Sequence, residues 1–311
     1  MSESKKNNKE TVIWLVTDGK PGHHNQSEGL VQALSSSLSI EVKRLPVLPF
    51  WKTLIGKLFH KNFVLKLFPA PDLVIGAGNA THKTLLLLSW VFGAKSIVLM
   101  KPDLPRFLFD LCLIPEHDAV PASDKVIVTR GVLNRIVPAE KKNINQGLIL
   151  IGGPSKHYGW DTEATLKQIE SVVSEMRHIQ WTISDSRRTP GEASSALQAL
   201  NKENIEFISV DDVDSEWLPE KLAEANYVWV TRDSVSMVYE ALTSGALVGL
   251  LEVPEIRESR VSRGINDLLK EGKVLDFSQW SSGQGFPEVA ENFGEAARCA
   301  QEVIARCQLD D

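Results

Sequence analysis

Two adjacent histidines, His23 and His24, are the side chains best suited to move a proton near neutral pH, where imidazole titrates. They follow an apolar run, and Asn25 with Glu28 has the spacing of a capping pair, which predicts a helix start beside this turn. The sequence therefore predicts a general base here, within hydrogen-bond reach of a ligand. An ordinary exposed pair of loop histidines is the alternative. The same turn supplies three more residues predicted to face the ligand: Gly19, Lys20 and Gly22.

A second turn of the first half carries glycines, an amide and a further histidine. Residues 76–82 follow an apolar run, at the position where the strands of open α/β sheets end and bind ligands. We therefore expect Gly78, Asn79 and His82 to lie on the same side of a site as the histidine pair. A plain tight turn, with His82 on a helix surface, is the alternative.

Two segments of the second half have the residue types that bind phosphate. Residues 151–160 are rich in glycine, so their backbone N–H groups can wrap a diphosphate, but they match neither a dinucleotide fingerprint nor a Walker loop. Residues 186–190 place two arginines after an apolar run, where guanidinium groups bind phosphate oxygens bidentately. A solvated charge pair neutralised by Asp185 is the alternative for the arginines. The predicted phosphate-binding residues are Gly152, Gly153, Ser155, Lys156, Arg187 and Arg188.

The stretch 231–245 predicts the end of a strand, a capped helix and a glycine stop. Free N–H groups beside Ser234 and Ser236 would form an anion site at the helix start. Glu240 follows Ser234 by six residues, where a carboxylate could accept hydrogen bonds from ribose hydroxyls. A simple helix cap with a surface glutamate is the alternative.

Short apolar runs that alternate with helical patterns must position these turns, and this alternation is typical of parallel α/β architecture. A chain of 311 residues exceeds the size at which one core usually keeps growing, which favours two domains. We expect a tail at 1–10, a Rossmann-like domain at 11–135 and a linker at 136–146. A second Rossmann-like domain is expected at 147–287, with a helix at 288–311 that could cross back. Expected strands lie at 11–17, 40–45, 72–75, 96–100, 111–114, 125–129, 147–151, 181–184, 205–210, 227–230 and 246–251.

Composition argues against several classes of protein. A net charge of −6 disfavours general nucleic-acid binding. Three cysteines without CxxC spacing indicate neither a disulfide framework nor a zinc site. The polar first ten residues argue against an ordinary secretory signal, and the apolar run 85–92 is too short to span a membrane. These features predict a cytoplasmic protein, either soluble or peripheral to a membrane.

One segment reverses the acidic balance of the chain. Residues 42–71 carry six Lys or Arg and no acidic residue, and aromatic and aliphatic side chains are interleaved with them over 50–68. This mixture suits the interface of an anionic membrane. An amphipathic helix packed on its own domain, with its lysines in water, is the alternative.

Five motifs together resemble the mitochondrial-fission "elongated mitochondria" family over nearly the whole chain. They are Gly-Lys-Pro-Gly-His at 19–23, Gly-Ala-Gly-Asn-Ala-Thr-His at 76–82, Gly-Gly-Pro-Ser-Lys-His at 152–157, Ser-Arg-Arg-Thr-Pro at 186–190 and Thr-Arg-Asp-Ser-Val-Ser-Met at 231–237. The resemblance implies the GT-B-like fold, in which two Rossmann-like domains face each other across a cleft. The domain at 11–135 would then lie on the acceptor side and the domain at 147–287 on the nucleotide-sugar side. It extends more loosely to GT-B enzymes that transfer sugars from nucleotide donors to lipid-linked acceptors.

By this resemblance the chain is expected to be a metal-independent glycosyltransferase that uses a nucleotide-diphosphate sugar and an envelope glycan or lipid acceptor. The base would be His23 or His24, and the first turn departs from the run of glycines seen in those enzymes, which leaves the choice open. Arg187 and Arg188 would contact the diphosphate, Ser234 and Ser236 a phosphate, and Glu240 the ribose. We expect no cofactor besides the donor, no metal and no nucleic acid, and a location at the inner face of the cytoplasmic membrane. A nucleotide-sugar 2-epimerase of the same fold and a non-catalytic membrane-associated adaptor are the alternatives.

Overall fold

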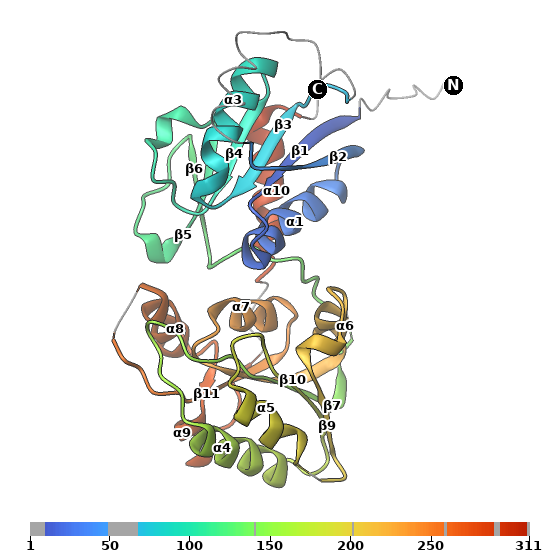
Figure 1. The fold of residues 1–311 in the computed structure, drawn as a ribbon, viewed down its shortest axis with the longest axis vertical. Helices are drawn as coiled ribbons and strands as arrows, with labels where there is room; N and C mark the ends of the chain where they lie inside the picture. The colour runs from blue at the N-terminus through green and yellow to red at the C-terminus, as the bar shows by residue number, and fades with distance from the viewer. Residues whose placement is uncertain are drawn as a thin grey trace, which may run out of the picture. The chain divides into compact units, whose positions relative to one another are not determined.

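The computed structural model describes residues 10–48, 68–139, 141–200, 202–257, 260–288 and 293–309. The chain forms two compact units, one of residues 1–135 with 295–311 and one of residues 136–294. Each unit contains a six-stranded sheet in which neighbouring strands are parallel (Figure 1). The predicted α/β class with two Rossmann-like sheets is confirmed.

The sheet of the first unit has the strand order β2-β1-β3-β4-β5-β6. Its inner strands are apolar along nearly their whole length and are buried on both faces. Continuous apolar runs of this kind are typical of parallel strands covered by helices on both sides. The strands are β1 (Thr11–Thr17), β2 (Ile40–Pro46), β3 (Leu73–Ala77), β4 (Lys95–Leu99), β5 (Leu111–Pro115) and β6 (Val126–Thr129).

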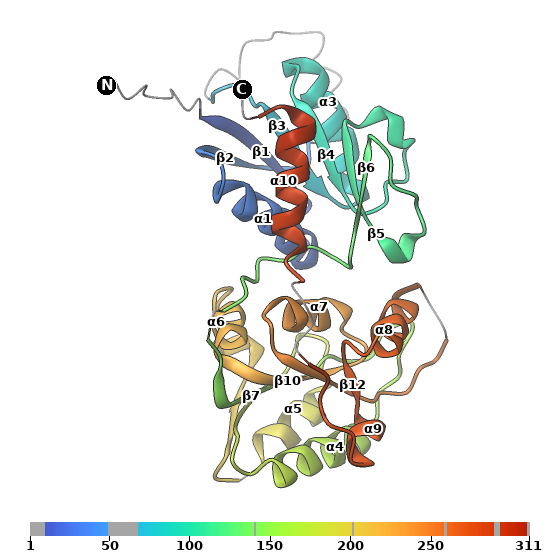
Figure 2. The same ribbon diagram turned by 180° about the vertical axis from the view of Figure 1, so that it is seen from behind.

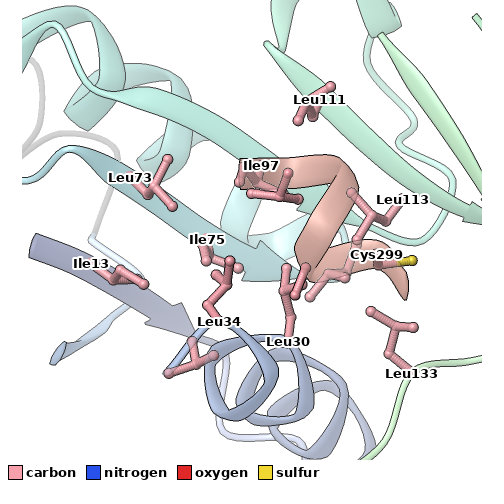
Figure 3. Close-up of a cluster of buried hydrophobic side chains, with 14 of the residues drawn as sticks. Ile13, Leu30, Leu34, Leu73, Ile75, Ile97, Leu111, Leu113, Leu133 and Cys299 are labelled. Carbon is pink, nitrogen blue, oxygen red and sulfur yellow. The ribbon is translucent and has the colours of Figure 1, made fainter. Parts of the chain in front are cut away.

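Helices α1 (Pro21–Ser35) and α10 (Glu295–Cys307) lie side by side on one face of this sheet (Figure 2). Figure 3 shows side chains of both helices in one buried cluster with the strands, among them Leu30 of α1, Cys299 of α10 and Ile75 of β3. The chain therefore returns to its first unit to complete that core. Helix α3 (His82–Phe92) covers the other face, where Leu85 and Leu88 pack in a cluster with Trp14 and Val74. Short 3-10 helices are η2 (Asn79–Thr81), η3 (Arg106–Leu108) and η4 (Glu116–Asp118).

The sheet of the second unit has the order β12-β11-β10-β7-β8-β9. Trp181 and Trp229 fill the core between this sheet and helix α4. Figure 1 shows α4 and α5 on one face of the sheet and α6, α7 and α8 on the other. The elements are β7 (Asn143–Leu150), α4 (Thr162–Glu175), β8 (Gln180–Ser184), α5 (Gly191–Gln198), β9 (Ile205–Ile208), η5 (Val210–Asp212), α6 (Trp217–Glu224), β10 (Ala225–Thr231), α7 (Val235–Thr243), β11 (Leu247–Leu251), α8 (Arg260–Lys270), β12 (Leu275–Asp276) and α9 (Phe277–Ser281).

Each predicted strand overlaps an observed one, but two features differ from expectation. The two-residue strand β12 has no apolar run of its own and was not expected. Strand β7 begins at Asn143, inside the segment predicted as a linker. Its first three residues, Asn-Ile-Asn, are exposed and form no apolar run, and only its second half is buried.

Most of the basic segment predicted to face a membrane lies outside the described residues. Of its described cations, Lys43 pairs with Glu41 at 2.8 Å and Arg44 pairs with Glu28 at 2.6 Å. In the described part of the chain, every helix is too short or too polar to cross a bilayer.

Candidate functional site

The two histidine-bearing turns of the first unit lie next to each other. Strand β1 pairs with β3, with Val16 opposite Gly76, so both strands end at the same edge of the sheet. The turn after β1 leads into α1, and the turn after β3 leads through η2 into α3. Parallel topology therefore brings together residues that are about sixty positions apart in the chain.

The His23 ring is hydrogen-bonded to Asp18, an aspartate to which the sequence alone assigned no role. The His23 Nδ1 atom lies 2.9 Å from Asp18 Oδ2, and the Asp18 side chain is only 6% exposed. The Lys20 amide donates to the other carboxylate oxygen at 3.2 Å, in a turn that Gly19 makes with a φ of +80°. Burial acts to raise the pKa of Asp18, but the Lys20 amide and the His23 side chain together hold it below its ordinary value.

The His23 ring packs directly against Gly78 of the neighbouring turn. A Cβ atom at Gly78 would lie 2.3 Å from His23 Cε1, and Gly78 has a φ of +81° that L-residues rarely adopt. Glycine is thus required here both by the backbone and by the ring. When Nδ1 carries the proton and donates it to Asp18, Nε2 is the ring atom that can accept a proton.

His24 has a different environment. Its Nε2 lies 3.7 Å from Glu28, which already binds Arg44 through both carboxylate oxygens at 2.6 and 2.9 Å. The capping pair predicted from Asn25 and Glu28 is wrong, because α1 begins earlier, at Pro21, and both residues lie inside it. Proline is favoured in the first helical turn, where its missing N–H costs nothing.

His82 is buried beside this turn and is not a helix-surface residue. It is 2% exposed, and its ring packs edge-on against Phe109 at 5.4 Å between centroids. Burial lowers the pKa of His82, and the nearby Asp103 carboxylate opposes that shift. The Asn79 amide donates to Asp103, so the ends of β3 and β4 are joined by a side-chain bond.

In the second unit, the glycine-rich turn is locked to two other strand ends. The Gly152 amide donates to Thr231 Oγ1 at 2.7 Å, and the Gly153 amide donates to Asp233 Oδ2 at 3.0 Å. Thr189 Oγ1 donates to the Gly152 carbonyl at 2.6 Å. Neither glycine has room for a side chain, since a Cβ atom would lie 2.3 Å from Asp233 at Gly152 and 2.1 Å from a backbone oxygen at Gly153.

These bonds correct one predicted role. The amides of Gly152 and Gly153 were expected to wrap a diphosphate, but both donate within the protein and both residues are buried. The Ser155 hydroxyl is also bonded within the protein, because it accepts hydrogen bonds from the His157 and Tyr158 amides at 3.1 Å each. Lys156 is exposed.

The two predicted arginines differ in their surroundings. Arg187 is exposed, whereas Arg188 Nη2 lies 2.8 Å from Asp233 and its Nη1 donates to the Gly153 carbonyl at 2.9 Å. Asp185 does not neutralise them as the alternative supposed. Its carboxylate instead accepts from Ser194 Oγ at 2.6 Å and from the Val210 amide at 2.8 Å.

Helix α7 begins at Val235, two residues after Asp233. Ser234 occupies the N-cap position without a side-chain capping bond, and the first turn contains no acidic residue. Its N–H groups and positive dipole end are therefore suited to an anion. Ser236 is exposed in this turn, while Glu240 further along is only 8% exposed, so the surface-glutamate alternative is wrong.

The candidate residues thus fall into two clusters, one in each unit. The first contains His23 with Asp18, Gly78, Asn79 and His82, and the second surrounds the start of α7. A polar hollow of about 560 Å³ lies elsewhere, at the amino ends of β7 and β8, and contains none of the predicted residues. In the described ranges, no group of three or more His, Cys, Asp or Glu residues could hold a metal ion.

Comparison with known proteins places this chain among GT-B-like folds. A family model described as mitochondrial fission ELM1 matches residues 21–307. An uncharacterised protein of Rickettsia prowazekii (strain Madrid E) is 22% identical over 325 residues, covering 86% of this chain and 90% of that protein.

Two solved structures share the fold at low sequence identity. The UDP-GlcNAc 2-epimerase of Neisseria meningitidis, bound to UDP-GlcNAc, is 13% identical with a TM-score of 0.53 over 97% of this chain and 100% of that one. The glycotransferase of kitacinnamycin is 13% identical with a TM-score of 0.54 over 96% of this chain and 100% of that one. The predicted resemblance in family and fold is confirmed.

Proposed function

This chain belongs to the mitochondrial fission ELM1 family, and we propose that it is a glycosyltransferase that moves a sugar from a nucleotide-diphosphate sugar to an envelope glycan or lipid acceptor. The observation that carries the proposal is the Asp18–His23 pair at 2.9 Å. A buried carboxylate that orients an imidazole is the arrangement needed to activate a hydroxyl nucleophile.

In the proposed reaction His23 is the base. Its Nε2 accepts the proton of the acceptor hydroxyl as that oxygen forms a bond to the anomeric carbon of the donor sugar. The bond between that carbon and the diphosphate oxygen breaks, and the nucleoside diphosphate leaves with the electron pair. Asp18 holds the ring through Nδ1 and stabilises the imidazolium that forms.

The second unit supplies the groups for the departing diphosphate. The start of α7, where Ser234 is buried at the N-cap and Ser236 is exposed, and the arginines Arg187 and Arg188 are the proposed contacts for its negative charge. Glu240 is the proposed ribose contact. Support for a nucleotide diphosphate comes from fold relatives whose structures contain bound UDP or UDP-GlcNAc.

The acceptor class rests on sequence alone. The cationic and apolar composition of residues 42–71 suits an anionic membrane surface, from which a lipid-linked acceptor could be reached. Transfer further requires the donor held by the second unit to reach His23 of the first.

The test is product analysis with a panel of UDP-, GDP- and CMP-sugars and a lipid extract as the source of acceptors. We expect one donor to release its nucleotide and to glycosylate an acceptor, and His23→Ala to lower that rate by about 10²–10⁴-fold. His24→Ala is the matched control, because its side chain lies outside the Asp18 pair, and it should retain most activity.

Two other outcomes would replace the proposal. Some fold relatives are named as 2-epimerases, and an isomerised sugar with its nucleotide still attached would assign that reaction instead. A chain that turns over no donor, while associating with membranes equally well as the wild type and as a His23→Ala/His24→Ala variant, would be an adaptor.

A further inference from the structure

The ion pair between Arg188 and Asp233 bridges three strand ends of the second unit. Arg188 follows β8, Asp233 follows β10, and Gly153 follows the strand between them, β7. The guanidinium donates to Asp233 Oδ2 at 2.8 Å through Nη2 and to the Gly153 carbonyl at 2.9 Å through Nη1. These two hydrogen bonds, to residues that follow two different strands, fix the plane of the guanidinium. One of them is made to Asp233, the residue before the N-cap of α7.

The burial of Asp233 costs folding free energy. Its side chain is fully covered, and although Oδ2 accepts from Gly153 and Arg188, its Oδ1 atom has no hydrogen-bond partner among the described residues. A buried carboxylate that is only half satisfied costs stability relative to a neutral group of the same shape. A role in stability alone therefore does not explain it.

Arg188, in contrast, retains access to solvent. Its side chain is 43% exposed while the Asp233 side chain is 0% exposed, so the pair presents only its cationic partner to a ligand. A guanidinium that is already held in place loses less conformational freedom when it binds an anion. The aspartate thus lowers the cost of binding at the arginine without touching the ligand.

We propose that Asp233 is a positioning residue that holds Arg188 as a preformed clamp for the pyrophosphate group of the nucleotide ligand. The inference rests on the proposed function for the identity of the ligand, and it assigns Asp233 to the site for the first time. The alternative is competition, in which Asp233 withholds Arg188 from the ligand. The two cases predict opposite changes in affinity when the aspartate is neutralised.

The test is calorimetric titration of the full chain with UDP, uridine and inorganic pyrophosphate. Asp233→Asn keeps the shape and the acceptor for the Gly153 amide but removes the charge that holds Arg188. We expect it to weaken UDP and pyrophosphate binding about tenfold, the size of one charge-assisted hydrogen bond, and to leave uridine unchanged. In an Arg188→Gln background the same substitution should have no further effect.

Two further variants keep the result interpretable. Glu163→Gln removes one negative charge from an exposed pair of the same unit and should leave affinity unchanged. Arg188→Lys keeps the charge on an exposed side chain but cannot bridge Asp233 and Gly153 while it binds a phosphate, and it should lose as much affinity as Arg188→Gln. If Asp233→Asn fails to fold, the UDP affinity of Arg188→Lys tests the proposal in its place.

The proposal would be overturned if Asp233→Asn bound UDP more strongly, or if Arg188→Lys kept wild-type affinity. It would also be overturned if Asp233→Asn lowered UDP affinity equally in the wild type and in Arg188→Gln. A wild-type protein that binds neither UDP nor pyrophosphate would overturn it as well. A protein that binds UDP through the pair but transfers no sugar would contradict the proposed function and leave this inference standing.

Discussion

At the scale of single residues, the structure distinguishes two histidines that are adjacent in the chain. His23 has a buried carboxylate on one ring nitrogen and a glycine beneath the ring, whereas His24 contacts a glutamate that Arg44 already occupies. The helical turn separates them, because neighbouring residues on a helix point in directions about 100° apart. Both histidines were predicted as candidate bases because they are adjacent in the chain, but only His23 has a carboxylate partner that could orient it as a base.

Asp18 is expected to act through His23. Asp18→Asn replaces the carboxylate by a neutral amide, which cannot stabilise the positive charge of the imidazolium. The kcat for transfer should therefore fall by about 100-fold, while the KM for the donor changes little. The measurement is steady-state kinetics of Asp18→Asn, alone and combined with His23→Ala. A further loss when Asp18→Asn is added to His23→Ala would contradict a role through the histidine.

The three cysteines are expected to be unreactive in the folded protein. Burial raises the pKa of Cys112 to about 11, of Cys299 to about 12 and of Cys307 to about 11, so each is a neutral thiol at pH 7.5. Mass spectrometry after brief iodoacetamide treatment should find no modified cysteine in the native chain and three in denaturant. Rapid alkylation of the native protein would show that these side chains are accessible as thiolates.

At the scale of elements, the close approach of two turns explains why position 78 is glycine. An alanine there would meet the His23 ring and would also hold a backbone conformation that is nearly exclusive to glycine. Both costs are set by the parallel pairing of β1 with β3, which brings the turns together.

A double-mutant cycle separates the two costs. Gly78→Ala should destabilise the protein by about 2–4 kcal/mol, from backbone strain and the collision together. In a His23→Ala background the collision disappears, and we expect the loss to shrink by about 1 kcal/mol or more. Urea unfolding of the four proteins measures this, and equal losses in both backgrounds would mean that the ring does not oppose the methyl group.

The strands could be predicted from the sequence, and the pairs that define the site could not. Apolar runs such as that of β1 carry a local signal because a parallel strand is buried on both faces. Asp233 contacts Gly153, which lies eighty positions earlier in the chain, and no local pattern reveals such a pair. The start of strand β7 was predicted too late because its first residues, Asn-Ile-Asn, are exposed and lack a continuous apolar run.

At the scale of the whole molecule, the chain leaves its first unit and returns to it. Helix α10 buries Cys299, Val303 and Ile304 in the core that Leu30 and Leu34 of α1 also line. Its start is tied to β6, because Glu295 accepts from the Arg130 amide at 2.9 Å and Arg298 donates to the Val128 carbonyl at 2.7 Å. The first unit therefore has a complete core only when the end of the chain is present.

Truncation of a core residue on α10 should weaken the first unit without changing the ligand site of the second. Val303→Ala removes two buried methyl groups and should cost about 2 kcal/mol in unfolding free energy. Gln301→Ala, an exposed neighbour on the same helix, is the matched control. Urea unfolding and UDP titration test this, and an altered UDP affinity in Val303→Ala would contradict the division into separate ligand and core functions.

The most direct test of the account is the melting temperature of the full chain with UDP, GDP, CMP, their sugars and the matching nucleosides. A ligand that binds only the folded state raises that temperature in proportion to the logarithm of its concentration above the Kd. We predict that one nucleoside diphosphate raises it and that its nucleoside does so much less, in the wild type and in His23→Ala alike. A melting temperature that no nucleotide changes would contradict the claim that the second unit binds a nucleotide diphosphate.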